Sequence, residues 1–140
     1  MLREARRRAH WVRAFLMVTA GALVVLLLSG CTPSPTQQAE QLMARYGLHP
    51  VGRPVTRSVR LDARTTNYGL FLEASKAIGL DLAEHTGKVE VLVYPLRVPS
   101  QEVTANAAFV ISGGKVVGAW VHPHEAIPGI VPLKDFAGRP

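Results

Sequence analysis

A basic start followed by an uninterrupted apolar run is the feature that most limits what this chain can fold into. Five arginines lie within residues 1–13, and residues 14–28 read AFLMVTAGALVVLLL, without a charge or a proline. A positive end, an apolar stretch of this length and small residues after it are typical of a secretory signal peptide. We therefore expect residues 1–30 to be a signal peptide. The remaining roughly 100 residues suffice for one domain with its own core.

The residues directly after the apolar run are Leu28, Ser29, Gly30 and Cys31. This tetrapeptide resembles the lipobox of bacterial lipoproteins. The resemblance implies that Leu28, Ser29 and Gly30 are recognised by a dedicated signal peptidase, and that the sulfur of Cys31 carries diacylglycerol. Two acyl chains on one residue anchor a protein stably, whereas one chain is marginal. We therefore expect a lipid anchor at Cys31 that holds the mature protein on the cell membrane, facing outside the cytoplasm.

The apolar run has one alternative interpretation, an uncleaved membrane anchor. Fifteen residues of helix span about 22 Å, which is short of the roughly 30 Å hydrocarbon core of a bilayer. Residues 29–31 bring the helix closer to that length, so the alternative stays open. Residues 31–36 contain prolines at positions 33 and 35, and they are expected to form an extended tether.

The charge of the chain is concentrated in the leader. The formal net charge is +6, and the five arginines and one glutamate of residues 1–13 supply +4 of it. The other eleven Lys and Arg face nine Asp and Glu, which leaves +2 for the rest. A nearly neutral domain does not favour a nucleic-acid partner. Cys31 is the single cysteine, so no intramolecular disulfide is possible.

The apolar periodicity after the leader predicts two helices and four strands. Ala39, Leu42, Met43 and Tyr46 form one stripe, so we expect a helix over residues 37–46 that is capped by Thr36. A strand is expected over 55–61. A second helix is expected over 67–78, begun by a threonine at position 65 or 66 and ended by a glycine at position 79.

Three further strands are expected over residues 88–98, 103–112 and 115–121. Gly113 and Gly114 between the last two predict a two-residue hairpin turn. The proline-rich end after His122 is expected to be irregular. The order α-β-α-β-β-β predicts an α+β domain over residues 37–137, with one antiparallel sheet and the helices packed on one face.

The domain also resembles a family of small, uncharacterised lipoproteins from Gram-positive bacteria that is known as a domain of unknown function. The resemblance covers about residues 40 to 120 and lies mostly in turns and caps. It implies no particular activity. The residues that carry it are Asn67-Tyr68, Gly79-Leu80-Asp81-Leu82, Gly87-Lys88-Val89, Tyr94, Ala105-Asn106 and Gly113-Gly114-Lys115-Val116-Val117-Gly118.

The richest cluster of metal-binding side chains is His122, His124 and Glu125. Residues two apart on an extended chain point the same way, so the two imidazoles can meet one ion. A further ligand is needed, and His85 or His49 is a candidate. The alternative, which we favour, is that these residues form a solvated loop after the last strand and bind no ligand. No metal ligand and no cofactor is therefore expected, and His122, His124 and Glu125 are kept as candidates.

Enzymatic chemistry finds little support in the chain. Ser112 and His122 lie at opposite ends of the last hairpin, roughly 20 Å apart, so they cannot form a catalytic pair. We also considered pairs of carboxylates for a glycosidase, and none stands out because turns and solvated faces explain them. No catalytic residue is assigned. The pairs considered are Asp81 with Glu84 and Asp62 with Glu73.

Two other sets of residues are candidates for binding. The arginines could meet lipid headgroups or anionic wall polymer, or they could simply form a solvated strand edge. Tyr94 and Trp120 are candidates for an exposed aromatic patch, although core packing is favoured for Trp120. The four arginines are Arg53, Arg57, Arg60 and Arg64.

These observations together favour a lipid-anchored accessory or interaction domain outside the cytoplasm, and not an enzyme. Its partners would be the membrane, through the lipid, and an envelope protein or peptide that binds the open sheet face or a strand edge. The alternative is a metal-binding envelope lipoprotein that uses His122 and His124.

Overall fold

The computed structural model describes residues 30–97, 104–124 and 129–136. The chain divides into two compact units, Met1–Thr32 and Pro33–Pro140. The described residues of the first unit, 30–32, are exposed and lack regular structure. The expected signal peptide lies almost entirely outside the described residues. Among the described residues, no helix is both long enough and apolar enough to cross a membrane.

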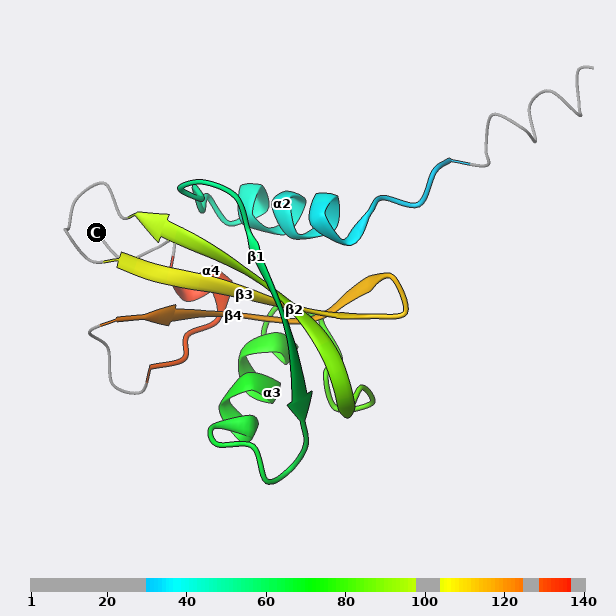
Figure 1. The fold of residues 1–140 in the computed structure, drawn as a ribbon. Coiled ribbons are helices and arrows are strands. Elements are labelled where there is room, and N and C mark those ends of the chain that lie inside the picture. Colours follow the sequence, from blue (N-terminus) through cyan, green and yellow to red (C-terminus); the bar gives the residue numbers. More distant parts are fainter. Residues whose placement is uncertain (1–29, 98–103, 125–128, 137–140) are drawn as a thin grey trace, which may run out of the picture. The chain divides into compact units, whose positions relative to one another are not determined.

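The second unit is built around one antiparallel sheet with the strand order β1-β2-β3-β4 (Figure 1). Each strand pairs with the next one along the chain, so the sheet is a simple meander. The predicted α+β class and the order α-β-α-β-β-β are confirmed, and one further short helix follows them among the described residues. The strands are β1 (Val55–Leu61), β2 (Gly87–Arg97), β3 (Thr104–Ser112) and β4 (Lys115–Pro123).

The hairpin between β3 and β4 follows the prediction from its two glycines. Gly113 and Gly114 have φ values of 57° and 75°, and Ser112 pairs with Lys115 across the turn. Two successive residues with positive φ are what a type I′ turn needs, and glycine adopts them without steric cost. The strand β4 continues two residues beyond the predicted end, so His122 belongs to the sheet.

The first described helix, α2 (Pro35–Arg45), begins earlier than the sequence pattern indicated. Ser34, and not Thr36, is its N-cap. The backbone N–H of Gln37 donates to Ser34 Oγ at 3.2 Å, and the N–H of Ser34 donates to Gln37 Oε1 at 2.9 Å, which completes a capping box. Pro35 occupies the first turn, where its missing N–H costs nothing. The helix therefore begins inside the segment that was expected to be an extended tether.

The second helix, α3 (Tyr68–Lys76), is shorter than predicted, and neither threonine caps it. Its N-cap is Asn67, which has a left-handed backbone (φ 63°) and makes no side-chain cap bond. Thr65 has another role, because its Oγ1 accepts a hydrogen bond from the backbone N–H of Asp62 at 3.0 Å. The threonine thus stabilises the turn after β1.

The helices cover both faces of the sheet, so the prediction of one shared face holds only for α2 and α4 (Leu133–Phe136). Figure 1 shows α2 and α3 on opposite sides of the strands. Side chains alternate along a strand, and the two core clusters take alternate residues of β3. The cluster under α2 and α4 includes Ala107 and Phe109, and the cluster under α3 includes Ala108 and Val110.

Tyr94 is not the exposed aromatic residue that was considered for a binding patch. Its side chain is 1% exposed and packs edge-on against Phe109, with ring centroids 5.8 Å apart. Its hydroxyl is buried and has no hydrogen-bond partner among the described residues. Burial, and secondarily the charge of Glu40, raises the pKa of this hydroxyl. Tyr94 therefore belongs to the core beneath α2 and α4.

Candidate binding pocket

An apolar cavity of about 410 Å³ opens on the face of the sheet that α3 covers. All four strands contribute to it, together with α3 and the residues before α4. The floor of the cavity consists of side chains that strand alternation directs to the same side of β2, β3 and β4. They are Val91, Val93, Ala108 and Trp120. A volume of this size lies within the range of small-molecule sites, roughly 300–1,000 Å³.

Two stacked rings form one wall of the pocket. Phe71 of α3 lies on Trp120 of β4, with ring centroids 4.1 Å apart and an interplanar angle of 15°. Trp120 is only 7% exposed, so the packing that was favoured for it is confirmed. Its ring nevertheless lines the pocket, as does that of Phe71. The two rings are therefore both a core contact and part of a surface that a ligand can reach.

The pocket exists because α3 leaves part of the sheet face uncovered. Ser75 of α3 is fully buried against the outer edge of β4. The backbone N–H of Ala119 donates to Ser75 Oγ at 3.0 Å, and the same hydroxyl lies 3.5 Å from the Ala119 carbonyl oxygen. Since an edge strand has unpaired backbone groups, one serine can satisfy both. This contact holds α3 at the β4 side, and the sheet face toward β1 remains open.

The mouth of the pocket is basic and polar. Arg57 lies on β1 in line with Val59 and Leu61, and it is exposed. It makes no hydrogen bond and no ion pair with any described residue. Arg60 also lines the mouth, but its Nε lies 3.6 Å from Asp62 Oδ2. No acidic side chain belongs to the described lining, so the mouth carries a net positive charge.

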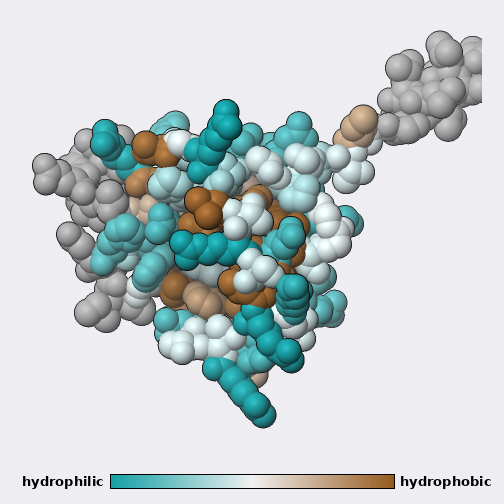
Figure 2. Space-filling model, viewed as in Figure 1, coloured by the Kyte–Doolittle hydropathy of each residue, from teal (hydrophilic) through white to brown (hydrophobic). Residues whose placement is uncertain are grey.

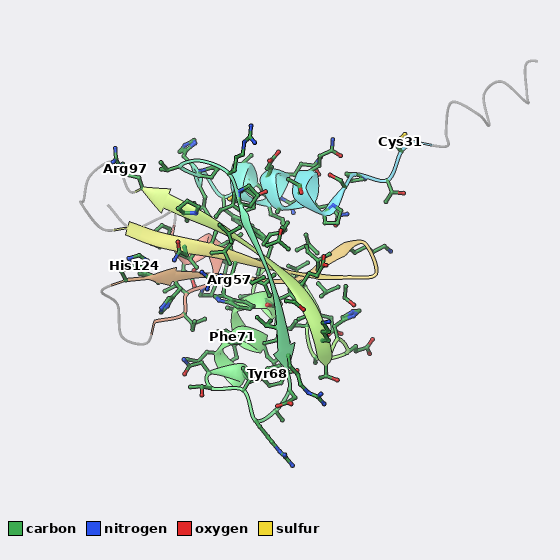
Figure 3. All side chains as sticks on the ribbon, viewed as in Figure 1. Cys31, Arg57, Tyr68, Phe71, Arg97 and His124 are labelled. Carbon is green, nitrogen blue, oxygen red and sulfur yellow. The ribbon has the colours of Figure 1, made fainter. Side chains whose placement is uncertain are left out.

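Figure 2 shows hydrophobic surface near the middle of the view, interrupted by hydrophilic side chains. Figure 3 shows Arg57 beside β1, with Phe71 and Tyr68 of α3 on the same side of the strand. Arg53 and Arg64, the other two arginines of the predicted basic cluster, are exposed and do not line the pocket. The cluster thus contributes two of its four members to the mouth.

His122 and His124 lie two residues apart at the end of β4, next to the pocket. His122 lines the mouth, and its Nδ1 is within hydrogen-bond distance of the Gly129 carbonyl oxygen. His124 Nε2 is 3.2 Å from Asn106 Nδ2. Within residues 30–97, 104–124 and 129–136, no group of three or more His, Cys, Asp or Glu could hold a metal. Glu125 lies outside the described residues, so the three-residue metal site stays a prediction.

The histidine that was considered as a further metal ligand has a different partner. His85 Nδ1 lies 3.1 Å from Ser112 Oγ, and both side chains are half-buried. Ser112 pairs with Lys115 at the hairpin, whereas His122 pairs with Asn106 near the other end of β3. The structure therefore separates Ser112 from His122, as the strand length indicated. The Ser112–His85 contact spans 27 positions, and no sequence spacing signals it.

The carboxylates occupy turns and solvated faces. Asp81 Oδ1 accepts a hydrogen bond from the backbone N–H of Ala83 at 3.2 Å, as predicted for the turn after α3. Asp62 Oδ1 accepts from the N–H of Arg64 at 2.8 Å. Glu73 and Glu84 are exposed. None of these side chains lines the pocket.

The pocket itself was missed from the sequence, although one signal pointed toward it. Arg57 interrupts an otherwise apolar strand face, and a charge at such a position needs an opening to solvent. Nothing local indicated where α3 would lie, and the opening depends on that. Phe71 stacks on Trp120, which lies 49 positions away in the sequence, so no local pattern indicated this contact.

Comparison with known proteins gives one family match. Residues 52–121 match a family described as a domain of unknown function, DUF4830. No curated protein matches the chain, and no solved structure does. The matched range includes β1, α3, β2, β3 and all of β4 except its last two residues. Most of the pocket therefore lies within the matched domain, whereas His122 and Ile130 of its lining lie beyond it.

Proposed function

Since the chain belongs to the DUF4830 family, which is described only as a domain of unknown function, we propose a role from its own residues: a lipid-anchored, non-enzymatic binding domain outside the cytoplasm. The proposal has two parts. The leader and Cys31 provide the anchor, and the pocket between β1 and α3 binds the ligand or partner.

The anchor is supported by the leader sequence and by the state of Cys31. An arginine-rich start, fifteen apolar residues and the Leu28–Cys31 tetrapeptide follow one another without a gap. Cys31 is exposed and free among the described residues, so its sulfur is accessible to an acyl donor. It is also the single cysteine of the chain, so lipidation leaves no other thiol.

The anchor is tested by metabolic labelling with radioactive palmitate in a bacterial host that processes lipoproteins. The wild-type chain should incorporate label and remain with the membrane after a carbonate wash. Cys31→Ser should incorporate none and keep the mass of the uncleaved precursor. Thr32→Ser, a conservative change at the next residue, should behave like the wild type. Equal labelling of the wild type and Cys31→Ser would disprove the anchor.

The observation that carries the binding role is the pocket. Its lining is almost entirely carbon, yet it remains open to solvent beside Arg57, which has no ion-pair or hydrogen-bond partner among the described residues. Folding alone would favour filling such a space with side chains. Each Å² of apolar surface that stays in contact with water costs the folded state about 25 cal/mol of hydrophobic stabilisation. Acid–base catalysis needs positioned titratable groups around the reacting atoms. An apolar lining is better suited to binding, which is why we propose no enzymatic activity.

Ligand binding can be read from Trp120. The chain has two tryptophans, and the other one, Trp11, lies in the leader. A Trp11→Phe chain therefore reports on the pocket alone. Occupation by an apolar ligand should shift the Trp120 emission, since its ring lines the cavity. Ala108→Phe, which places a ring on the floor, should abolish the shift. A shift that persists unchanged in this variant would place the ligand elsewhere.

A second candidate function is metal binding by His122 and His124. It is favoured by one observation, which is that both imidazoles lie at the end of β4 near the same polar residue, Asn106. The test is the zinc content of the purified protein after dialysis. Stoichiometric zinc that disappears in the double alanine variant would favour this candidate. Equal content in both proteins would reject it.

A further inference from the structure

We propose that the pocket between β1 and α3 takes a single-chain amphipathic anion, with the hydrocarbon tail on the Trp120 floor and the charged head at Arg57. The inference rests on the proposed binding role of the pocket and adds the chemical class of the ligand. A carboxylate and a phosphate share the required head-group chemistry. The tail and the head are argued separately below.

The lining of the cavity selects a hydrocarbon. Val91, Val93, Ala108 and the two stacked rings present almost only carbon to the space. A peptide in that space would bring one N–H and one C=O for each residue, and each would lose its hydrogen bonds to water. A hydrocarbon tail brings no such groups. The pocket therefore favours an acyl or alkyl chain over a peptide segment.

The size of the cavity favours one chain over two. Its volume of about 410 Å³ lies near the lower end of the range for small-molecule sites. Four strands and α3 surround it, so widening it would separate packed elements. A two-chain lipid would leave much of its apolar surface outside the pocket. A single chain can bury most of its surface.

The charge at the mouth selects an anion. Arg57 has no ion-pair or hydrogen-bond partner among the described residues, whereas the charge of Arg60 is partly offset by Asp62 at 3.6 Å. The described lining has no carboxylate to attract a cation. A positive head group would meet like charge, which acts against it. An anionic head group is therefore the complementary one.

Arg57 is placed so that the head and the tail of one ligand can bind at the same time. It shares the β1 face with Val59 and Leu61 and is exposed, so its methylene stem can lie along the apolar surface while the guanidinium remains in water. Figure 3 shows it on the same side of β1 as Phe71. A guanidinium can bind two oxygens of a carboxylate or phosphate at once. Tail burial and head binding can thus occur together.

The test is a set of titrations with short amphiphiles that share one tail. The full chain carrying Trp11→Phe is reconstituted in phosphatidylcholine vesicles, and Trp120 emission is followed during addition of octanoate, octyl phosphate, octanol or octylammonium. Octanoate should bind about fivefold more tightly than octanol, because an exposed ion pair between its carboxylate and Arg57 adds a gain in affinity of that order. Octylammonium should bind more weakly than octanol. The ratio of octanoate to octyl phosphate affinity identifies the preferred head group.

Matched arginine variants locate the charge effect. In Arg57→Gln the preference for octanoate over octanol should disappear, while octanol binding is retained and shows that the pocket is intact. Arg53→Gln, which removes an exposed arginine outside the lining, should keep the preference. Two results would overturn the proposal of an anionic head group at Arg57: equal affinity for octanoate and octanol in the parent chain, or a preference that survives in Arg57→Gln. Neither result would affect the proposed binding role of the pocket. No emission change with any of the amphiphiles would overturn the binding role as well.

Discussion

Replacing Ser75 by alanine tests the contact that positions α3. The Ser75 side chain is fully buried, and its hydroxyl accepts the hydrogen bond from the backbone N–H of Ala119 at 3.0 Å. The Ser75→Ala variant leaves that N–H buried without its partner. A buried donor that loses its partner costs about 1–3 kcal/mol. Alanine offsets a few tenths of a kcal/mol through its higher helix propensity, so we expect a net loss of about 1–2 kcal/mol.

The loss is measured by urea unfolding. The midpoint should fall while the slope m stays constant, since the unfolded surface area does not change. In a thermal scan, each kcal/mol should lower the melting temperature by about 4–8 °C for a domain of this size. Ser58→Ala on β1 is the matched control because Ser58 is exposed. Its midpoint should change by less than about 0.5 kcal/mol.

The same variant also tests whether the contact shapes the pocket. Ser75 follows Phe71 by one turn of α3, and Phe71 stacks on Trp120. A helix released from the β4 edge should alter the Trp120 emission of the folded state. An unchanged midpoint in Ser75→Ala would refute the reasoning about the orphaned N–H. A lower midpoint with unchanged emission would show that the contact stabilises α3 without positioning the pocket wall.

Two further predictions concern crowding and burial in the domain. Gly118→Ala places a methyl group 2.9 Å from Leu82 Cδ1, a separation that packed atoms do not tolerate. The variant should lose about 1–3 kcal/mol of stability. A urea unfolding midpoint equal to that of the wild type would contradict this prediction. Tyr94→Phe removes a buried hydroxyl that has no partner among the described residues, so at neutral pH it should leave stability unchanged or raise it by up to about 1 kcal/mol. Burial, followed by the charge of Glu40, raises the pKa of Tyr94 above 10.0, so the unfolded chain ionises first and wild-type stability should fall as the pH rises past 10. Tyr94→Phe should show a smaller fall over the same range, and equal pH profiles of the two proteins would exclude this origin.

The elements that the sequence predicted correctly are those governed by local chemistry. The two glycines at positions 113 and 114 specify a hairpin because of their positive φ values. Gly79, with a φ of 81°, likewise closes the turn after α3, where the N–H of Leu80 donates to the carbonyl oxygen of Ser75 at 3.0 Å. Strand alternation predicted the bounds of β1 without error. Each of these signals needs only a few neighbouring residues to act.

The helix starts were predicted less well because several residues compete for the same role. Ser34 and Thr36 can both cap a helix, and Pro35 at the first position together with Gln37 at the third decides in favour of Ser34. Thr65 looked like a cap for α3, but its hydroxyl accepts from the backbone after β1. A hydroxyl forms only a few hydrogen bonds, and the tertiary structure determines which partners it binds.

The sequence by itself determined the strand alternation, the turns and the α+β class, since these follow from the order of residues over short distances. The leader stays a prediction from the sequence. Only the tertiary structure decided that α3 lies opposite α2, that Ser75 joins the β4 edge, and that Arg57 stands over an open apolar floor. These features depend on packing between segments tens of residues apart. Periodicity shows that a helix face will be buried, but the surface that buries it follows from how all the elements fit together.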